Sequence, residues 1–162
     1  MKLGQRNLNR RAFLGSMAAL GASVSFVRSG ISAASYQVRT KAIPSTGERI
    51  PVIGMGSWIT FSVDDDQQAR NVRVEVLRAF FEAGGGVIDS SPMYGSSEEV
   101  IGYCLKRLGK RPSLFSATKV WTPIRWHGVK QMEISEQLWG EDRFDLMQIH
   151  NLLAWEDHLE TL

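Results

Sequence analysis

Short apolar runs alternate with longer amphipathic segments along most of the chain. The short runs, each with the length and apolar character of a buried strand, are 50–55, 87–89, 114–120 and 144–149. The segments that carry apolar side chains at helical spacing are 67–83, 97–108 and 129–139, with a further helix predicted over 155–162. This alternation predicts a parallel sheet covered by helices.

A hairpin is predicted ahead of this alternation. Residues 36–43 alternate well enough for a strand, and Pro44-Ser45-Thr46-Gly47 is a turn signal. The run 50–55 either completes this hairpin or begins the main sheet.

The helix over 67–83 has predicted boundaries at both ends. The acidic run 64–66 predicts a solvated cap, because the unpaired N–H groups at a helix N-terminus favour negative charge. The three glycines at 84–86 end the helix. The apolar positions expected to face the core are Val72, Val76, Leu77, Phe80 and Phe81.

The helix over 97–108 is expected to be capped by Ser97. Its predicted buried face is Val100, Ile101, Cys104, Leu105 and Leu108. Cys104 is the sole cysteine, which excludes an internal disulfide and a cysteine-rich metal site and predicts a small core residue. The sequence has no metal-ligand spacing, so we expect no metal.

Two architectures fit this alternation: an open doubly wound sheet and a (β/α)8 barrel. The first would be supported by a G-x-G-x-x-G turn, but Ile59 stands where the third glycine would follow Gly54 and Gly56. Polar residues instead follow each predicted strand, namely Ser57, Asp89, Lys119 and His150. Chemistry at the C-terminal ends of several strands is typical of the barrel.

Residues 1–34 have the order of an export signal. They hold five basic residues and no acid, which leaves 14 basic against 17 acidic residues in the rest of the chain. The net charge of +2 therefore gives no reason to expect nucleic-acid binding. The sequence Arg10-Arg11-Ala12-Phe13-Leu14 precedes a short apolar run diluted by Gly and Ser, and Ser32-Ala33-Ala34 follows it.

This leader resembles a twin-arginine signal, which is a receptor-read address and no membrane anchor. The resemblance implies recognition by the twin-arginine export machinery, cleavage near Ala34 and a periplasmic or exported protein. The alternative is an uncleaved membrane helix, for which the apolar run is too short. We therefore divide the chain into a signal peptide, 1–34, and an incomplete barrel domain, 35–162.

Four motifs in the right order resemble the aldo-keto reductase family. Three of them are GMGSW (54–58), FSATKVW (115–121) and FDLMQIHN (144–151). The other, which is followed by Gly102, reads Asp89-Ser90-Ser91-Pro92-Met93-Tyr94-Gly95-Ser96-Ser97-Glu98. The resemblance implies a (β/α)8 TIM barrel of aldo-keto reductase type, of which the chain holds the first four βα units behind a short N-terminal hairpin. It implies an NADPH-dependent reductase of aldehydes or ketones, with NADH as the alternative cofactor.

By the same resemblance, Tyr94 is the general acid, Lys119 tunes it, Asp89 orients Lys119, and His150 holds the carbonyl oxygen. Carbonyl reduction adds hydride to carbon and a proton to oxygen, so a proton donor must stand beside the substrate. A tyrosine starts near pKa 10, and a nearby ammonium is expected to lower that value. Each residue alone has a structural alternative, but a lysine within an apolar strand needs an acidic partner.

The resemblance also implies the residues that surround this group. Those expected at the cofactor are Gly56, Ser57, Trp58, Asp89 and Asn151, and those expected to line the substrate pocket are Trp58, Tyr94, Trp121 and His150. Packing under a loop is the alternative for the two tryptophans. His127 and His158 have no predicted role.

A complete barrel typically needs about 250 residues, and 128 residues follow Ala34. We therefore expect exposed sheet edges, self-association and little activity from this polypeptide alone. Two other functions stay open: a non-catalytic binding or regulatory module of the same fold, and a silent fragment.

Overall fold

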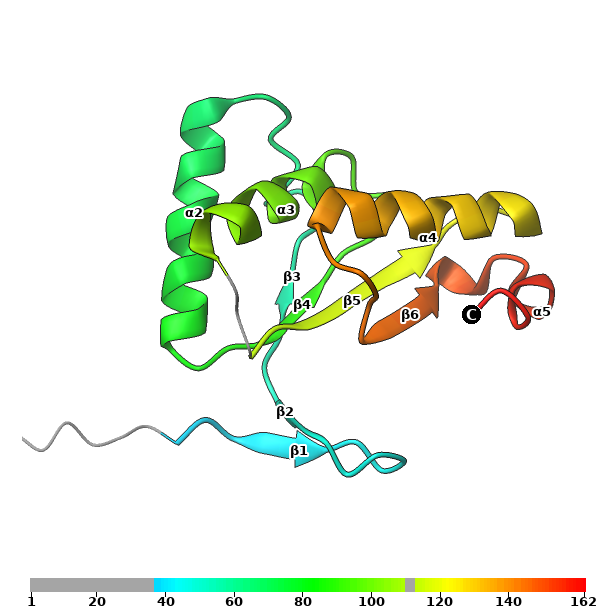
Figure 1. The fold of residues 1–162 in the computed structure, drawn as a ribbon, viewed down its shortest axis with the longest axis horizontal. Coiled ribbons are helices and arrows are strands. Elements are labelled where there is room, and N and C mark those ends of the chain that lie inside the picture. The colour runs from blue at the N-terminus through cyan, green and yellow to red at the C-terminus, as the bar shows by residue number, and fades with distance from the viewer. Residues whose placement is uncertain (1–36, 110–112) are drawn as a thin grey trace, which may run out of the picture. The chain divides into compact units, whose positions relative to one another are not determined.

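The computed structural model describes residues 37–109 and 113–162, which form a two-stranded hairpin and a four-stranded parallel sheet (Figure 1). The predicted leader, 1–34, lies outside the described residues. Among the residues described, no helix is long and apolar enough to cross a membrane.

The predicted hairpin is confirmed, in a shorter form. β1 (Thr40–Ala42) pairs antiparallel with β2 (Arg49–Pro51). Gly47 in the connecting turn has φ 75°, in the left-handed region that favours glycine. The apolar run 50–55 is divided, because its first residues complete the hairpin and its last residue begins the main sheet in β3 (Met55–Gly56).

The main sheet follows chain order. Its parallel strands are β3, β4 (Val87–Asp89), β5 (Phe115–Val120) and β6 (Leu146–Ile149). The register pairs Gly56 with Asp89, and Lys119 with Gln148. Consequently, the residues that follow each strand emerge at the same edge of the sheet.

The three long helices connect consecutive strands and lie on the same side of the sheet, as right-handed crossovers require (Figure 1). They are α2 (Gln67–Glu82), α3 (Ser97–Leu108) and α4 (Arg125–Trp139). α4 begins four residues before the predicted start. The predicted last helix is shorter, since a 3₁₀ turn, η2 (His150–Leu152), precedes α5 (Trp155–His158).

The core lies between α2, α3 and the sheet. The predicted buried face of α3 is confirmed: its five apolar residues are at most 8% exposed. On α2 the prediction was partly wrong, because Val74 is buried with Leu77 while Val72 and Val76 are 50% and 44% exposed. The fully buried core residues include Leu77, Ile88, Val100, Ile101 and Cys104.

The helix caps differ in part from prediction. The side chain of Asp66 caps α2 by accepting a hydrogen bond from the N–H of Ala69 at 2.9 Å. Ser97 does not cap α3, because Ser96 occupies the N-cap position. The hydroxyl of Ser97 instead donates to the carbonyl oxygen of Ser57 at 3.2 Å, which ties α3 to the loop after β3.

His158 joins the end of the described chain to the sheet. Its ring is fully buried, and Nε2 donates to the carbonyl oxygen of Thr122 at 2.6 Å. The ring packs on Gly128 of α4, where a Cβ atom would lie 2.7 Å from Cε1 of His158. His158 therefore has a structural role that the sequence did not predict.

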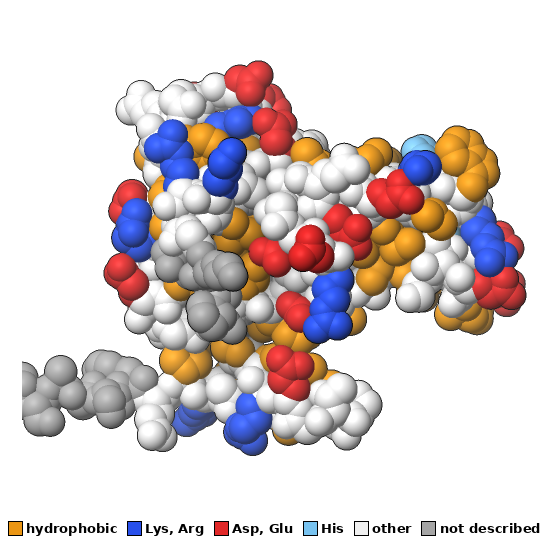
Figure 2. Space-filling model, viewed as in Figure 1, with side chains coloured by type: hydrophobic (Ala, Val, Ile, Leu, Met, Phe, Trp, Pro, Cys, Tyr) orange, Lys and Arg blue, Asp and Glu red, His pale blue; other side chains and the backbone are white. Residues whose placement is uncertain are grey.

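At the end of the molecule that carries α5, hydrophobic side chains are exposed among charged ones (Figure 2).

Candidate active site

An ion pair between neighbouring strands forms the centre of the site. Nζ of Lys119, on β5, lies 2.7 Å from Oδ1 and 2.6 Å from Oδ2 of Asp89, at the end of β4. It also donates to the carbonyl oxygen of Ser90 at 2.8 Å. The Lys119 side chain is 13% exposed, and its three hydrogens meet three acceptors. The acidic partner expected for this lysine is therefore present.

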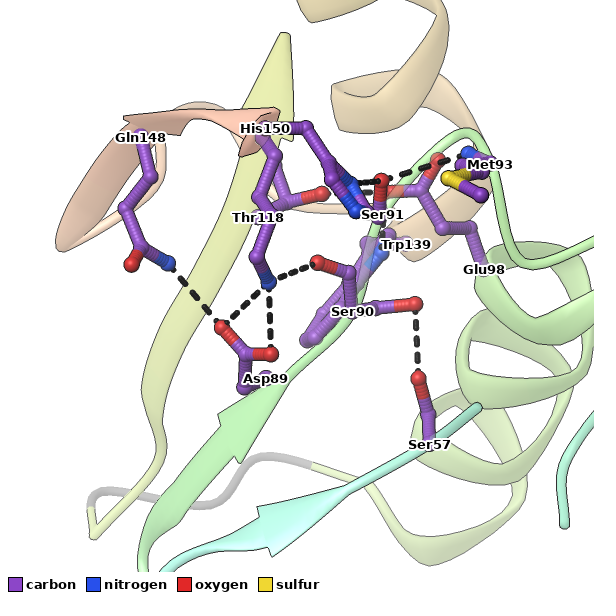
Figure 3. Close-up of polar contacts among 11 residues, drawn as sticks. Ser57, Asp89, Ser90, Ser91, Met93, Glu98, Thr118, Trp139, Gln148 and His150 are labelled. Carbon is purple, nitrogen blue, oxygen red and sulfur yellow. Dashed lines mark hydrogen bonds and ion pairs between the residues drawn. The ribbon is translucent and has the colours of Figure 1, made fainter. Parts of the chain in front are cut away.

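Gln148 supports the same carboxylate from the next strand. Its Nε2 donates to Oδ1 of Asp89 at 3.0 Å (Figure 3). The sequence analysis missed this residue, although a signal was available. Residues two apart on a strand share a face, so Gln148 lies on the face of β6 that leads to His150.

Tyr94 and His150 lie together beside this ion pair. Their ring centroids are 5.5 Å apart at an interplanar angle of 81°, which is an edge-to-face contact. Nζ of Lys119 lies 5.5 Å from the centroid of the Tyr94 ring. The structure thus brings together all four predicted catalytic residues, from two strands, the loop after β4 and the residue after β6.

The electrostatics of the two rings differ from the expectation for Tyr94. Burial, and next the charge of Asp89, raise the pKa of Tyr94 above its usual value. The expected net lowering of this pKa is not found in the structure, because burial and the charge of Asp89 outweigh the attraction of the Lys119 ammonium. Burial and then the charge of Lys119 lower the pKa of His150, with a smaller opposing effect of Asp89. Both rings are therefore neutral at pH 7.

His150 has a second partner that sequence reasoning missed. Its Nδ1 lies 2.7 Å from the hydroxyl oxygen of Ser91, in the loop after β4 (Figure 3). That oxygen also accepts a hydrogen bond from the N–H of Met93 at 3.2 Å. Ser91 is fully buried, and His150 is 8% exposed.

The residues expected at the cofactor have different surroundings. Ser57 is fully buried and donates its hydroxyl to that of Ser90 at 2.8 Å. This hydroxyl–hydroxyl contact joins the ends of β3 and β4, and the cofactor contact expected of Ser57 stays a prediction. Gly56 has open space where a side chain would be, and Asn151 is exposed with φ 56°.

The two tryptophans expected at the substrate pocket are both exposed. Trp58 is 62% exposed, and its ring centroid lies 6.4 Å from that of Tyr94. Trp121 is 41% exposed, and the side chain of Gln131 bonds to both its backbone N–H and its carbonyl oxygen. Neither tryptophan is packed under a loop, and Trp58 is the one that contacts Tyr94.

A buried carboxylate lies on the helix side of the site. Glu98 is 3% exposed and accepts hydrogen bonds from Thr118 at 2.6 Å, Ser135 at 3.0 Å and Trp139 at 3.3 Å. Burial raises its pKa, against a lowering by these bonds and by the charge of Lys119. Glu98 thereby joins α3 and α4 to β5 at Thr118, the residue before Lys119.

The profile of the Aldo/keto reductase family matches residues 52–162. The chain belongs to this family. Among curated relatives of this aldo-keto reductase chain, the aldo-keto reductase YhdN of Bacillus subtilis is 30% identical over 132 residues, which are 73% of this chain and 38% of the relative. The methylglyoxal reductase YeaE of Escherichia coli is 29% identical over 116 residues, or 70% of this chain and 40% of the relative. The chain thus spans about two fifths of the length of these relatives.

Solved structures of aldo-keto reductases share the fold. A thermostable aldo-keto reductase in complex with the inhibitor epalrestat superposes with a TM-score of 0.62 at 27% identity, covering 76% of this chain and 50% of that protein. An aldo-keto reductase from Klebsiella pneumoniae in complex with NADPH superposes with a TM-score of 0.59 at 24% identity, covering 76% and 45%. The parallel sheet and its helices are thus those of an aldo-keto reductase.

Proposed function

We propose that the protein in which this chain occurs is an oxidoreductase that reduces an aldehyde or ketone to an alcohol with a nicotinamide cofactor. The observation that carries the proposal is the convergence of Tyr94, His150 and the Asp89–Lys119 ion pair at the C-terminal edge of the sheet. A phenol beside a neutral imidazole provides one proton donor and one hydrogen-bond donor for a carbonyl oxygen.

The proposed cofactor is NADPH, on the strength of family membership. When bound, the reduced nicotinamide supplies the hydride that this chain's own side chains cannot. The residues present fit the nicotinamide end of such a cofactor, since Gly56 leaves open space at the end of β3 and Asn151 exposes its amide after β6. Asp89, held by Lys119 in the ion pair, would lie next to the nicotinamide end of the cofactor.

In the proposed mechanism, Tyr94 donates the proton. Its raised pKa keeps the phenol protonated at neutral pH, so the proton is available. As the proton leaves, the phenolate that forms is stabilised by the ammonium of Lys119, 5.5 Å from the ring centroid. His150 donates a hydrogen bond to the substrate oxygen and orients it. Trp58, exposed beside Tyr94, forms an apolar wall for the substrate.

The test is whether the whole protein reduces simple aldehydes. The reaction is measured as the loss of NADPH absorbance. Methylglyoxal is a suitable first substrate, because the relative from Escherichia coli is named for its reduction. Tyr94→Phe should lower kcat at least about 100-fold. Tyr103→Phe is the matched control, because the hydroxyl of Tyr103, on α3, donates to Asn71 of α2. If the unaltered protein and Tyr94→Phe bind NADPH equally well and neither reduces an aldehyde, the protein is a binding module instead.

We further propose that residues 37–162 correspond to the hairpin and first four βα units of a (β/α)8 barrel. The supporting observations are the strand order, the common side of the helices and the partial coverage of the solved relatives. A crystal structure of the whole protein would test it, and an open sheet would contradict it.

We also propose export through the twin-arginine pathway, on the sequence of residues 10–14 and 32–34. Arg10 and Arg11 replaced together by Lys should retain the precursor in the cytoplasm. The measurement is the N-terminal sequence and cell fraction of the product. An unprocessed N-terminus on the unaltered protein would refute cleavage near Ala34.

A further inference from the structure

The loop after β4 places a buried hydroxyl against the inner nitrogen of His150. Ser91 Oγ lies 2.7 Å from Nδ1, and both residues are almost completely screened from solvent. A contact of this length between two buried polar groups is a hydrogen bond, and one of the two atoms must donate.

The backbone of the same loop favours Ser91 as the donor. The N–H of Met93 already donates to Ser91 Oγ at 3.2 Å, which uses one lone pair of the hydroxyl. The hydroxyl hydrogen then needs an acceptor. Within 37–109 and 113–162, Nδ1 of His150 is the acceptor that this hydroxyl reaches. If Nδ1 carried the hydrogen instead, the Ser91 hydroxyl hydrogen would be buried without a partner, at a cost of about 1–3 kcal/mol.

The outer nitrogen of His150 has the opposite environment. Nε2 has no hydrogen-bond partner among the described residues and is not one of their fully buried unpaired atoms. It therefore reaches the open side of the site, beside the Tyr94 ring. The ring is neutral at pH 7 because burial lowers its pKa. A neutral imidazole carries one N–H hydrogen. If Nδ1 lacks that hydrogen, Nε2 carries it and donates; if Nδ1 has it, Nε2 accepts.

We propose that Ser91 is a positioning residue that donates to Nδ1 of His150 and thereby fixes the tautomer with hydrogen on Nε2. The catalytic consequence rests on the proposed reductase function, because only the Nε2–H tautomer can donate to a substrate carbonyl. In the Nδ1–H tautomer a lone pair would face the carbonyl oxygen and repel it. Ser91 acts on the substrate only through His150.

The proposal is tested first without turnover. Two-bond ¹H–¹⁵N correlation spectra of the ¹⁵N-labelled protein at pH 8 report which nitrogen of His150 carries hydrogen. The unaltered protein should show the Nε2–H tautomer. Ser91→Ala should show a mixture or the Nδ1–H tautomer, and Ser91→Thr, which keeps a hydroxyl, should restore Nε2–H. Ser116→Ala is the control, because that buried serine bonds Asp145 outside the site.

Kinetics of the same variants then test the consequence. Ser91→Ala should lower kcat/KM for the aldehyde by about tenfold to a hundredfold, leave the Kd of NADPH unchanged, and recover with Ser91→Thr. Should the threonine variant not fold, Ser91→Cys keeps a weaker donor and should recover partly. An Nδ1–H tautomer in the unaltered protein, or an unchanged Nε2–H spectrum in Ser91→Ala, would overturn the proposal. Those spectra are independent of activity, so absence of reductase turnover would refute the proposed function alone.

Discussion

Lys119 contacts both carboxylate oxygens of Asp89, at 2.7 Å and 2.6 Å, across two neighbouring parallel strands. The strand register explains this contact, because Asp89 lies opposite Ala117, on the same face of β5 as Lys119. Each charge offsets the cost of burying the other. The pair therefore fixes the place of a positive charge next to Tyr94 without leaving that charge unbalanced.

Replacing the lysine of this pair should abolish activity. Lys119→Met removes the ammonium that stabilises the phenolate of Tyr94 and leaves the Asp89 carboxylate unpaired. We expect kcat to fall at least about 100-fold, measured as NADPH oxidation by the whole protein. Lys130→Met is the control, since that lysine pairs with Glu133 on the exposed surface of α4. Comparable losses in both variants, or in neither, would contradict the role given to Lys119.

Gln148 should have a smaller, separable effect. Gln148→Leu removes one hydrogen bond to Oδ1 of Asp89 but leaves the two contacts with Lys119. A bond of about 1 kcal/mol corresponds to a roughly fivefold fall in kcat. Gln148→Glu should be worse, because it sets a second carboxylate against Asp89. The matched control is Gln137→Leu on the surface of α4. A leucine variant less active than the glutamate variant would count against this arrangement.

The pH dependence of reduction should follow the raised pKa of Tyr94. The donor must be protonated, so the rate should persist across neutral pH and fall only above about pH 10. Burial is the larger cause of this raised pKa, and the charge of Asp89 is the second. Asp89→Asn removes that charge and leaves the Lys119 ammonium without a counter-charge, and both changes lower the pKa of Tyr94. The basic limb of the kcat/KM profile should therefore move to lower pH.

Asp145→Asn serves as the control for this profile, because Asp145 accepts from Ser116 at the opposite end of β5. A basic limb that stays in place, or moves upward, in Asp89→Asn would show that another group limits the rate.

Glu98 should make the stability of the fold depend on pH. Burial raises its pKa in the folded state above the usual value. The stability contributed by the protonated form is therefore complete below the ordinary glutamate pKa and is lost as the pH rises through the raised value. As the pH rises from the ordinary glutamate pKa through the raised one, Glu98→Gln should gain in free energy of unfolding relative to the unaltered protein.

Urea denaturation at a series of pH values measures this difference. Glu133→Gln provides a control, since Glu133 is exposed on α4. If the difference in free energy of unfolding between Glu98→Gln and the unaltered protein does not change with pH, the pKa of Glu98 is not raised. If Glu133→Gln shows the same change with pH, the effect comes from surface charge instead.

The fold was predictable wherever one short pattern carried the information. The apolar face of α3 and the strand 87–89 were confirmed because their periodicity and their neighbouring glycines agree. The face of α2 was misjudged because Val72, Val74 and Val76 are equally apolar in sequence. Only the packing of α2 on α3 and the sheet decides which of the three is buried.

The site was predictable as a set of residues but not as a network. The four catalytic candidates stand in ordered motifs, whereas Ser91 and Gln148 act through partners about 60 positions away in the chain. The hydroxyl contact of Ser57 shows the same limit. Its place at a strand end suggested a ligand contact, but its bond with Ser90 depends on the pairing of β3 with β4, which no local pattern specifies.

The contact between His158 and Gly128 constrains how this chain can vary over evolution. An alanine at 128 would bring its Cβ within 2.7 Å of the imidazole. His158 would then have to move or be replaced by a smaller residue. The imidazole, in turn, holds the carbonyl of Thr122 just beyond the strand that carries Lys119. Among close homologues, a substitution of Gly128 should therefore be accompanied by a substitution of His158.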